Sequence, residues 1–398
     1  MTKLLELNIR EAQLKRRLRR HLASLGYTRS QNGNLLLQDA GKDTIRQLHA
    51  PQRAAILKTQ REFISTKLPR LHRHFASGNQ VDPANIRIRI ERVESGTWQG
   101  DLFRLATLTW SVPVSNGFGR RMRYLVWDDS NEKLIGIFAI GDPVFNLSVR
   151  DNSVGWSGKD RAARLVNLMD AYVLGAVPPY NMLLGGKMIA CLIRSTDVYK
   201  DFQRQYGGST GIISGEQKGA RLLAVTTSSS MGRSSIYNRL KLNGVTYFQS
   251  VGYSGGWGHF HVPDALFADM RDYLRDSGEA SPDLHAFGEG PNWRIRTLRS
   301  ALKTLGFKGD LLKHGIQREV FISLLADNAT KILNTGRGRP DIRRLLSVDE
   351  IGELAVERWI GRRALTRPEF NAWDSAQLPE LIHASYRQRQ KDTDIRAA

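Results

Sequence analysis

The 398-residue sequence has one cysteine, Cys191, which excludes an internal disulfide and a zinc site built from several cysteines. No apolar run approaches the roughly 20 residues needed to cross a bilayer, and Glu6 and Glu11 interrupt the first apolar stretch, unlike a signal peptide. The Gly-x-x-x-x-Gly-Lys-Ser/Thr motif of phosphate-binding loops is also missing, which argues against ATP hydrolysis by this chain. These absences predict a cytoplasmic protein without a membrane partner.

What the sequence has in excess is positive charge, with a formal net charge of +20. Residues 1–80 carry 16 Lys/Arg against 5 Asp/Glu, residues 81–290 carry 23 against 21, and residues 291–398 carry 20 against 13. A nearly neutral middle between two basic ends predicts a folded platform whose ends grip a polyanion such as nucleic acid. Solubility is the alternative reason for part of this charge.

The residue pattern predicts a basic helical region over 1–80, an α/β (α+β) core over 81–278 and a basic, mainly helical region over 279–398. Helices are expected over 2–25, 51–76, 188–207, 232–242, 263–278, 292–306 and 347–365. Strands are expected over 86–90, 105–114, 121–129, 133–142, 168–177, 221–229, 245–254, 259–263 and 318–325. This order predicts a mixed, largely antiparallel sheet with packed helices, flanked by helical regions.

Three aspartates, Asp142, Asp151 and Asp170, lie near predicted strand ends. Carboxylates grouped at such positions can hold Mg²⁺ for phosphodiester cleavage, so they are candidate catalytic residues of a nuclease. The alternative is a buried Asp–Arg pair involving Arg150 that fixes the loop. No Asp-x-Asp or Glu-x-Lys nuclease signature accompanies these aspartates.

Two histidines and a hydroxyl-rich run are further candidates. Alternation along a strand places His259 and His261 on one face, where they could serve a metal or a phosphate, although a solvent-facing edge strand explains them equally. The run 226–235 offers hydroxyls, backbone amides and a guanidinium that suit a phosphate, with Ser230, Arg233 and Ser234 as candidates. The alternative there is a multiply capped helix start.

Basic side chains for nucleic-acid contact are expected on two helices: Arg16, Arg17 and Arg20 near the N-terminus, and Arg294, Arg296, Arg299 and Lys303 beside Trp293. Packed helices with solvated basic faces are the alternative. The stretch TGRGRP at 335–340 is a basic loop that could follow a phosphate backbone.

The element order of the middle segment resembles the GNAT acyltransferase fold. That resemblance implies that Gly185, Gly186 and Lys187, at the start of a helix, lie where those enzymes bind the pyrophosphate of acyl-CoA. It also implies that Tyr237 is the acid that protonates the leaving thiolate. The loop pattern departs from the family at Met182 and Lys187, so the resemblance implies the fold more than the cofactor.

A closer resemblance covers residues 80 to 365. The strings LTWSVPVSNGFGRRMRYLVWD, GIFAIGDPVFNLSVRDNSVGW and NLMDAYVLGAVPPYNMLLGGK resemble the DruA family of the Druantia anti-phage system. The resemblance implies antiviral defence alongside other Druantia proteins, including a helicase-like partner, and it implies no catalytic residues. We therefore expect a defence component that binds nucleic acid, most simply DNA. A Mg²⁺-dependent nuclease or nickase and an acyl-CoA-dependent acyltransferase are the alternatives.

Overall fold

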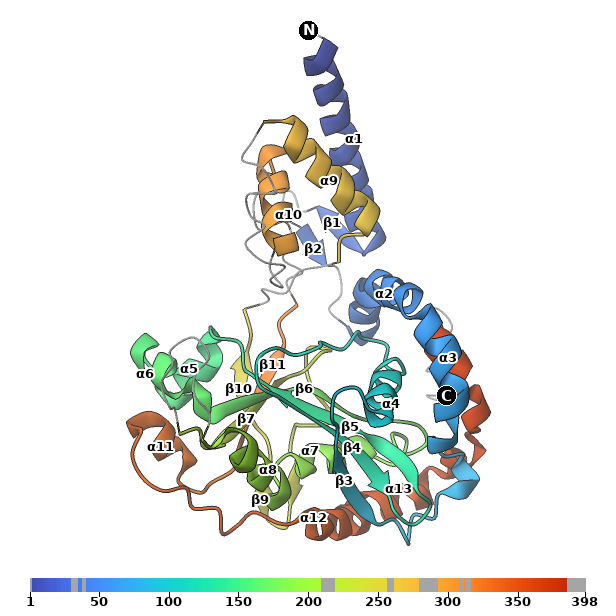
Figure 1. The fold of residues 1–398 in the computed structure, drawn as a ribbon, viewed down its shortest axis with the longest axis vertical. Helices are drawn as coiled ribbons and strands as arrows, with labels where there is room; N and C mark the ends of the chain where they lie inside the picture. The colour runs from blue at the N-terminus through green and yellow to red at the C-terminus, as the bar shows by residue number, and fades with distance from the viewer. Residues whose placement is uncertain are drawn as a thin grey trace. The chain divides into compact units, whose positions relative to one another are not determined.

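The computed structural model describes residues 2–29, 35–37, 41–208, 219–255, 261–278, 293–307, 311 and 316–384. The chain forms two compact units (Figure 1), the first from residues 1–55 and 255–317 and the second from residues 56–254 and 318–389. The units therefore differ from the three consecutive segments expected from the sequence, because each combines separate stretches of chain.

The first unit is mainly helical. Its elements are α1 (Thr2–Ser24), β1 (Tyr27–Arg29), β2 (Leu35–Leu37), the first part of α2 (Lys42–Thr59), α9 (Asp264–Asp276) and α10 (Trp293–Thr304). Leu14, Leu18 and Leu22 recur every four residues on α1 and are buried, as an amphipathic helix requires. Helix α9 packs against both α1 and α10, and β1 pairs with β2 antiparallel. The helices expected over 2–25, 263–278 and 292–306 are confirmed.

A mixed sheet organises the second unit. Among the described residues it has seven strands in the order β10-β11-β7-β6-β5-β4-β3. Their bounds are β3 (Ile88–Arg92), β4 (Arg121–Asp128), β5 (Lys133–Gly141), β6 (Leu168–Ala176), β7 (Ala224–Ser228), β10 (Gln249–Tyr253) and β11 (Glu319–Leu324). Among the strands of the described residues, only β6 and β7 pair in parallel, so the expected mixed, largely antiparallel α/β sheet is confirmed.

Helices cover this sheet. The α-helices are α3 (Arg61–Leu71), α4 (Trp98–Thr107), α5 (Ser148–Val154), α6 (Gly158–Arg164), α7 (Gly185–Leu192), α8 (Thr196–Tyr206), α11 (Ala329–Thr335), α12 (Val348–Ala355), α13 (Gly361–Thr366) and α14 (Leu378–His383). A π-helical turn, η6 (Val356–Ile360), joins α12 to α13. The short 3₁₀ turns are η1 (His72–His74), η2 (Gly78–Gln80), η3 (Leu165–Asn167), η7 (Pro368–Ala372) and η8 (Ser375–Gln377). A separate two-stranded antiparallel sheet pairs β8 (Lys241–Leu242) with β9 (Val245–Thr246). None of the described helices is long and apolar enough to cross a membrane.

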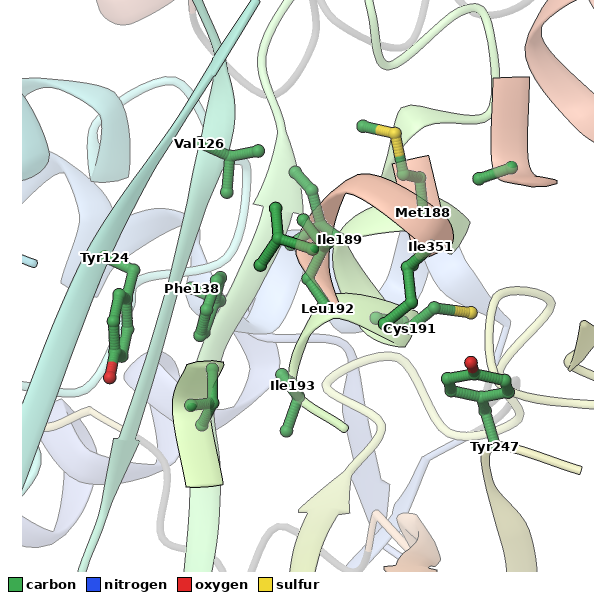
Figure 2. Close-up of a cluster of buried hydrophobic side chains, with 14 of the residues drawn as sticks. Tyr124, Val126, Phe138, Met188, Ile189, Cys191, Leu192, Ile193, Tyr247 and Ile351 are labelled. Carbon is green, nitrogen blue, oxygen red and sulfur yellow. The ribbon is translucent and has the colours of Figure 1, made fainter. Parts of the chain in front are cut away.

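Side-chain alternation along the strands divides the core between the two faces of the sheet. On β4, Tyr124 and Val126 point to the face covered by α7, α8 and α12, whereas Leu125 and Trp127 point to the face covered by α3, α4 and α14. Figure 2 shows the first cluster, in which α7 brings apolar side chains toward the strands and Tyr124 stacks on Phe138 at 4.6 Å between ring centroids. The platform is thus buried on both faces.

Two predicted elements of the second unit are wrong, and local hydrogen bonds explain why. The strand expected over 105–114 overlaps α4, because the Thr97 side chain accepts a hydrogen bond from the backbone of Gly100 and caps a helix there. The helix expected over 232–242 is a series of turns. The Ser234 hydroxyl accepts from the backbone of Ile236 and Tyr237, which competes with helical bonding, and Arg239 adopts a positive φ of 58°.

Other helix boundaries also differ. The helix expected over 51–76 is two helices, with Pro51 inside α2 and Pro69 inside α3. The helix expected over 188–207 is divided into α7 and α8, since the Ser195 side chain caps a new helix start. The helix expected over 347–365 begins at the predicted capping box, in which Ser347 and Glu350 exchange hydrogen bonds.

The chain leaves the sheet after β10 and returns to it at β11, its neighbour. The backbone of Ser254 donates to the carbonyl of Arg318 at 2.8 Å, and the backbone of Arg318 donates to the Ser254 hydroxyl at 3.1 Å. Residues 255–317 are therefore an insertion between two paired strands, and its two ends lie side by side.

Candidate functional site

The predicted catalytic aspartates lie around the strand ends of the second unit, each with its own partners. Asp142 follows β5 and accepts hydrogen bonds from the Arg120 side chain (Nε, 2.7 Å) and the Arg120 backbone (2.9 Å). The same guanidinium donates to the carbonyls of Val166 and Leu168, just before and at the start of β6. This pair joins the start of β4, the end of β5 and the start of β6, so its geometry is that of a structural clamp.

Asp151 lies in a buried cluster of charges on α5 and α6. Its Oδ1 accepts from Nε and Nη2 of Arg150 at 2.8 and 2.6 Å, and its Oδ2 accepts from Nη1 of Arg161 at 2.9 Å. Arg150 is fully buried and also donates to the carbonyls of Val144 and Phe145. The alternative interpretation from the sequence, a buried Asp–Arg pair that fixes the 141–145 loop, describes this arrangement.

Asp170 is the third residue of β6 and lies opposite Gly141, the last residue of β5, beside the strand end that Asp142 follows. The Thr226 hydroxyl donates to Asp170 Oδ1 at 2.7 Å. Burial raises the pKa of Asp170 to about 6, against the opposing effects of that hydrogen bond and of the Arg150 charge. The described residues contain no group of three His, Cys, Asp or Glu side chains placed to hold a metal ion. The Mg²⁺ role of the three aspartates stays a prediction.

Tyr237 is buried on the face of the sheet covered by α7, α8 and α12. Its ring lies 5.1 Å from that of Phe248 and 5.2 Å from that of Phe321. Burial raises the pKa of Tyr237 to about 12, although a hydrogen bond with Thr227 acts against the shift, so the phenol stays protonated at neutral pH. Tyr237 therefore retains a proton to donate, while its aromatic contacts place it in the core.

Ser234 belongs to a turn whose polar groups bind a carboxylate of the chain itself. Glu319 Oε2 accepts from the Ser234 backbone at 3.2 Å and from Asn238 Nδ2 at 3.0 Å, and Oε1 accepts from the Ser250 hydroxyl at 3.0 Å. Glu319 is 5 % exposed. Ser230 and Arg233 of the same run are exposed. A negative charge thus already binds beside this turn, as the predicted phosphate would.

The predicted CoA loop lies at the start of α7. The backbone of Gly185 donates to the Tyr180 carbonyl and that of Lys187 to the Leu184 carbonyl, each at 2.9 Å. A Cβ on Gly185 would lie 2.7 Å from the Tyr180 oxygen, so glycine permits this close approach. Two of the amides that the resemblance assigns to pyrophosphate therefore bond within the chain. Cofactor binding by Gly185, Gly186 and Lys187 stays a prediction.

Of the predicted histidine pair, His259 lies outside the described residues. His261 belongs to the first unit, where its carbonyl oxygen lies 2.8 Å from Nε2 of His21. Burial lowers the pKa of the His261 imidazole, and the charge of Arg294 acts in the same direction. Residues 261–263 form no strand, so the strand expected over 259–263 is wrong for its described part.

The basic helices of the first unit divide their arginines between ion pairs and exposed positions. Arg17 of α1 pairs with Asp269 of α9, and Arg294 of α10 pairs with Asp264 at 2.7 Å and lies over the Phe267 ring. These two arginines stabilise helix packing. The other predicted nucleic-acid contacts are exposed: Arg16, Arg20, Arg296, Arg299 and Lys303. On α10 the last three follow at spacings of three and four residues, which places them on one face.

A second basic surface lies in the second unit, on residues 334–340, which we call the arginine loop. Its backbone is bound by side chains from other elements: Arg164 donates to the Asn334 carbonyl, Arg221 to the Gly338 carbonyl at 2.5 Å, and Asn328 to the Arg339 carbonyl at 2.9 Å. Gly338 has a φ of +111°, which favours glycine. The side chains of Arg337 and Arg339 are exposed, and neither forms an ion pair among the described residues.

Comparison with known proteins decides the family. Residues 39–335 match the family described as Druantia protein DruA. Druantia protein DruA from Escherichia coli (strain UMEA 4076-1) is 60% identical over 379 residues, which cover 95% of this chain and 94% of that protein. The chain belongs to the DruA family. No solved structure matches this DruA family member, and its likeness to the GNAT fold stays a prediction.

The DruA match includes the strand-end aspartates, Tyr237 and the basic face of α10, whereas Arg16, Arg17 and Arg20 precede it. Sequence reasoning missed Glu319, whereas it had singled out the stretch TGRGRP at 335–340, which contains Arg337 and Arg339, as a basic loop that could follow a phosphate backbone. Glu319 could have been found because it is a lone carboxylate at the start of an otherwise apolar predicted strand. The arginine loop lies in a strongly basic stretch, since residues 331–344 contain five Lys/Arg and one Asp.

Proposed function

We propose that this DruA family member binds DNA through contacts to the phosphate backbone, as its part in Druantia anti-phage defence beside other Druantia proteins, including a helicase-like partner. The observation that carries the proposal is the arginine loop, in which Arg337 and Arg339 are exposed while their backbone is held by hydrogen bonds from three other segments. A loop ordered before binding loses little conformational entropy when it meets a ligand.

Charge compensation supports the same conclusion. Other arginines of this segment are paired, since Arg343 binds Asp341 and Arg344 lies 3.7 Å from Asp327. Arg337 and Arg339 lack such partners among the described residues, so their charge is available to a polyanion. Phosphate contacts of this kind supply affinity that does not depend on base sequence and that falls steeply with salt.

The exposed basic face of α10 in the first unit supports a second set of contacts. Arg296, Arg299 and Lys303 share that face, and Arg16 and Arg20 are one helical turn apart on α1. The arrangement favours binding over catalysis, because the carboxylates Asp142 and Asp151 are engaged by guanidinium groups. The geometry supports neither the nuclease nor the acyltransferase interpretation as well as it supports nucleic-acid binding.

The test is fluorescence anisotropy with a labelled DNA duplex of about 30 base pairs, titrated between about 50 and 200 mM salt. We expect affinity to fall with salt, and Arg337→Ala with Arg339→Ala to reduce the slope of log K against log salt by about 2, one for each phosphate contact removed. Arg204→Ala is the matched control, because Arg204 is 73% exposed but paired with Asp201. Absence of binding at about 50 mM salt would refute the proposal.

A further inference from the structure

A cavity of about 480 Å³ lies beside the π-helical turn of the second unit. Its lining comes from the turn between β8 and β9 and from the α12–η6–α13 helix, namely Leu242, Asn243, Leu354, Glu357, Arg358, Trp359 and Arg362. This volume falls within the range of small-molecule sites, which extends from about 300 to 1,000 Å³. None of the sequence-predicted site residues lines it.

The backbone at this cavity departs from regular helix. Val356–Ile360 form a π-helical turn, in which the Gly361 backbone donates to the Val356 carbonyl five residues earlier. The wider turn changes the direction of the side chains that follow it relative to an uninterrupted α-helix. Single π turns inside α-helices occur frequently at functional sites. Here the turn contains Trp359 and ends two residues before Arg362, and both side chains line the cavity.

Two cations lie close to the indole of Trp359, and a third lines the cavity. Nζ of Lys187, from α7, lies 5.9 Å from the Trp359 ring centroid, and Cζ of Arg358 lies 6.0 Å from it, while Arg362 lines the same cavity. Arg358 and Arg362 are exposed. No ion pair among the described residues involves any of the three cations.

Two arginine–aromatic contacts elsewhere in the second unit are compensated by an ion pair. Arg120 lies over Phe202 and pairs with Asp142, and Arg161 lies over Phe145 and pairs with Asp151. At Trp359 the only acidic lining residue is Glu357, which forms no ion pair among the described residues. The cluster therefore has positive charge in excess beside an aromatic ring.

We propose that this cavity binds a single nucleotide, with its base against Trp359 and its phosphate near Arg358 and Arg362, the two arginines that line it. Stacking of a base on an aromatic side chain contributes sequence-tolerant affinity, and uncompensated cations supply the charge for a phosphate. Glu357 can accept a hydrogen bond from a ribose hydroxyl or a base amino group. The same chemistry is offered by a free nucleoside monophosphate and by the 5′-phosphorylated end of a strand; in the second form the inference rests on the proposed DNA binding.

The experiment uses the full chain and adenosine 5′-monophosphate, with adenosine and inorganic phosphate as partial ligands, in calorimetric titrations. We expect saturable binding of the monophosphate and weaker binding of either part. Trp359→Leu should weaken binding about ten-fold, which corresponds to the stacking of one base. Arg358→Glu with Arg362→Glu should abolish it. A 5′-phosphorylated tetranucleotide that binds more tightly than the monophosphate identifies a strand end, and equal or weaker binding identifies a free nucleotide.

Two control variants test whether any loss of nucleotide binding is specific to this cavity. Trp98→Leu removes an exposed tryptophan at a different position, which stacks on His74, and Arg204→Glu reverses a paired surface charge; both should leave nucleotide binding unchanged. The inference is overturned if neither the monophosphate nor the tetranucleotide binds, or if Trp359→Leu and the double charge reversal bind as the wild type does. Duplex binding that persists in that case leaves the proposed function standing, whereas nucleotide binding without duplex binding sinks the proposed function alone.

Discussion

Replacing Asp151 by Asn tests whether this aspartate is structural. Three hydrogen bonds from the guanidinium groups of Arg150 and Arg161 end on its carboxylate, and Arg150 is 0% exposed. A hydrogen bond to a charged group contributes about 1.5–3 kcal/mol, and removing one partner of a buried ion pair costs about 3–5 kcal/mol because the other charge stays buried without compensation. We therefore expect Asp151→Asn to lower the free energy of unfolding by about 3–5 kcal/mol.

Urea unfolding followed by circular dichroism measures this loss. Glu353→Gln is the control, since Glu353 is exposed on α12, and it should change the unfolding free energy by no more than about 0.5 kcal/mol. Adding Arg150→Met to Asp151→Asn should recover part of the loss, because the uncompensated charge is then removed. A loss below about 1 kcal/mol for Asp151→Asn would contradict the structural role and would return Asp151 to the candidates for metal binding.

Three further predictions concern neighbouring positions. Burial raises the folded-state pKa of Asp170 to about 6, so the protonated form is favoured in the folded protein and wild-type stability falls as pH rises from about 4 through 6; Asp170→Asn should gain about 3 kcal/mol relative to wild type over this window, and a difference independent of pH in urea titrations would contradict the burial. Gly119→Ala should lose at least about 1–3 kcal/mol in the same assay, since Gly119 has a φ of +62° and a Cβ there would lie 2.0 Å from Asp142 Oδ2, and a neutral result would count against the clamp. Glu319→Leu should cost about 1–3 kcal/mol, because leucine cannot accept the hydrogen bonds of Ser234 and Asn238 and leaves these donors buried without a partner, and unchanged thermal unfolding would argue that the carboxylate is dispensable.

The sheet could be predicted largely from the sequence because its signal is local. Apolar runs bounded by turn residues identified β4, β5, β6 and β11, and the Ser347 capping box identified the start of α12. The errors arose where a single hydroxyl decides the local structure. Thr97 caps the start of α4, and this helix extends into the segment 105–114 that was expected to form a strand. The Ser234 hydroxyl stabilises a turn in the segment 232–242 that was expected to form a helix.

The site was less predictable, because its partners are distant in the chain. Arg221 binds the carbonyl of Gly338, 117 residues away, and Glu319 binds the backbone of Ser234, 85 residues away. The net charge of the sequence likewise does not show which arginines form ion pairs with acidic side chains in the folded protein. Arg17 and Arg294 were expected to contact nucleic acid, but in the first unit they pair with Asp269 and Asp264 of α9, a helix remote from Arg17 in sequence.

The insertion of residues 255–317 between β10 and β11 has a consequence for how the chain folds. Closing a flexible loop of this length costs about 2.4 kcal/mol more in entropy than closing a four-residue hairpin, by the logarithmic dependence on loop length. Pairing of the edge strand β10 with β11 thus has a higher closure cost than a tight hairpin would have, unless the inserted segment collapses first and shortens the effective loop. Acquisition of structure by α9 and α10 would then accelerate the pairing of Ser250 with Phe321, and the order of assembly would run from the insertion to the edge of the sheet.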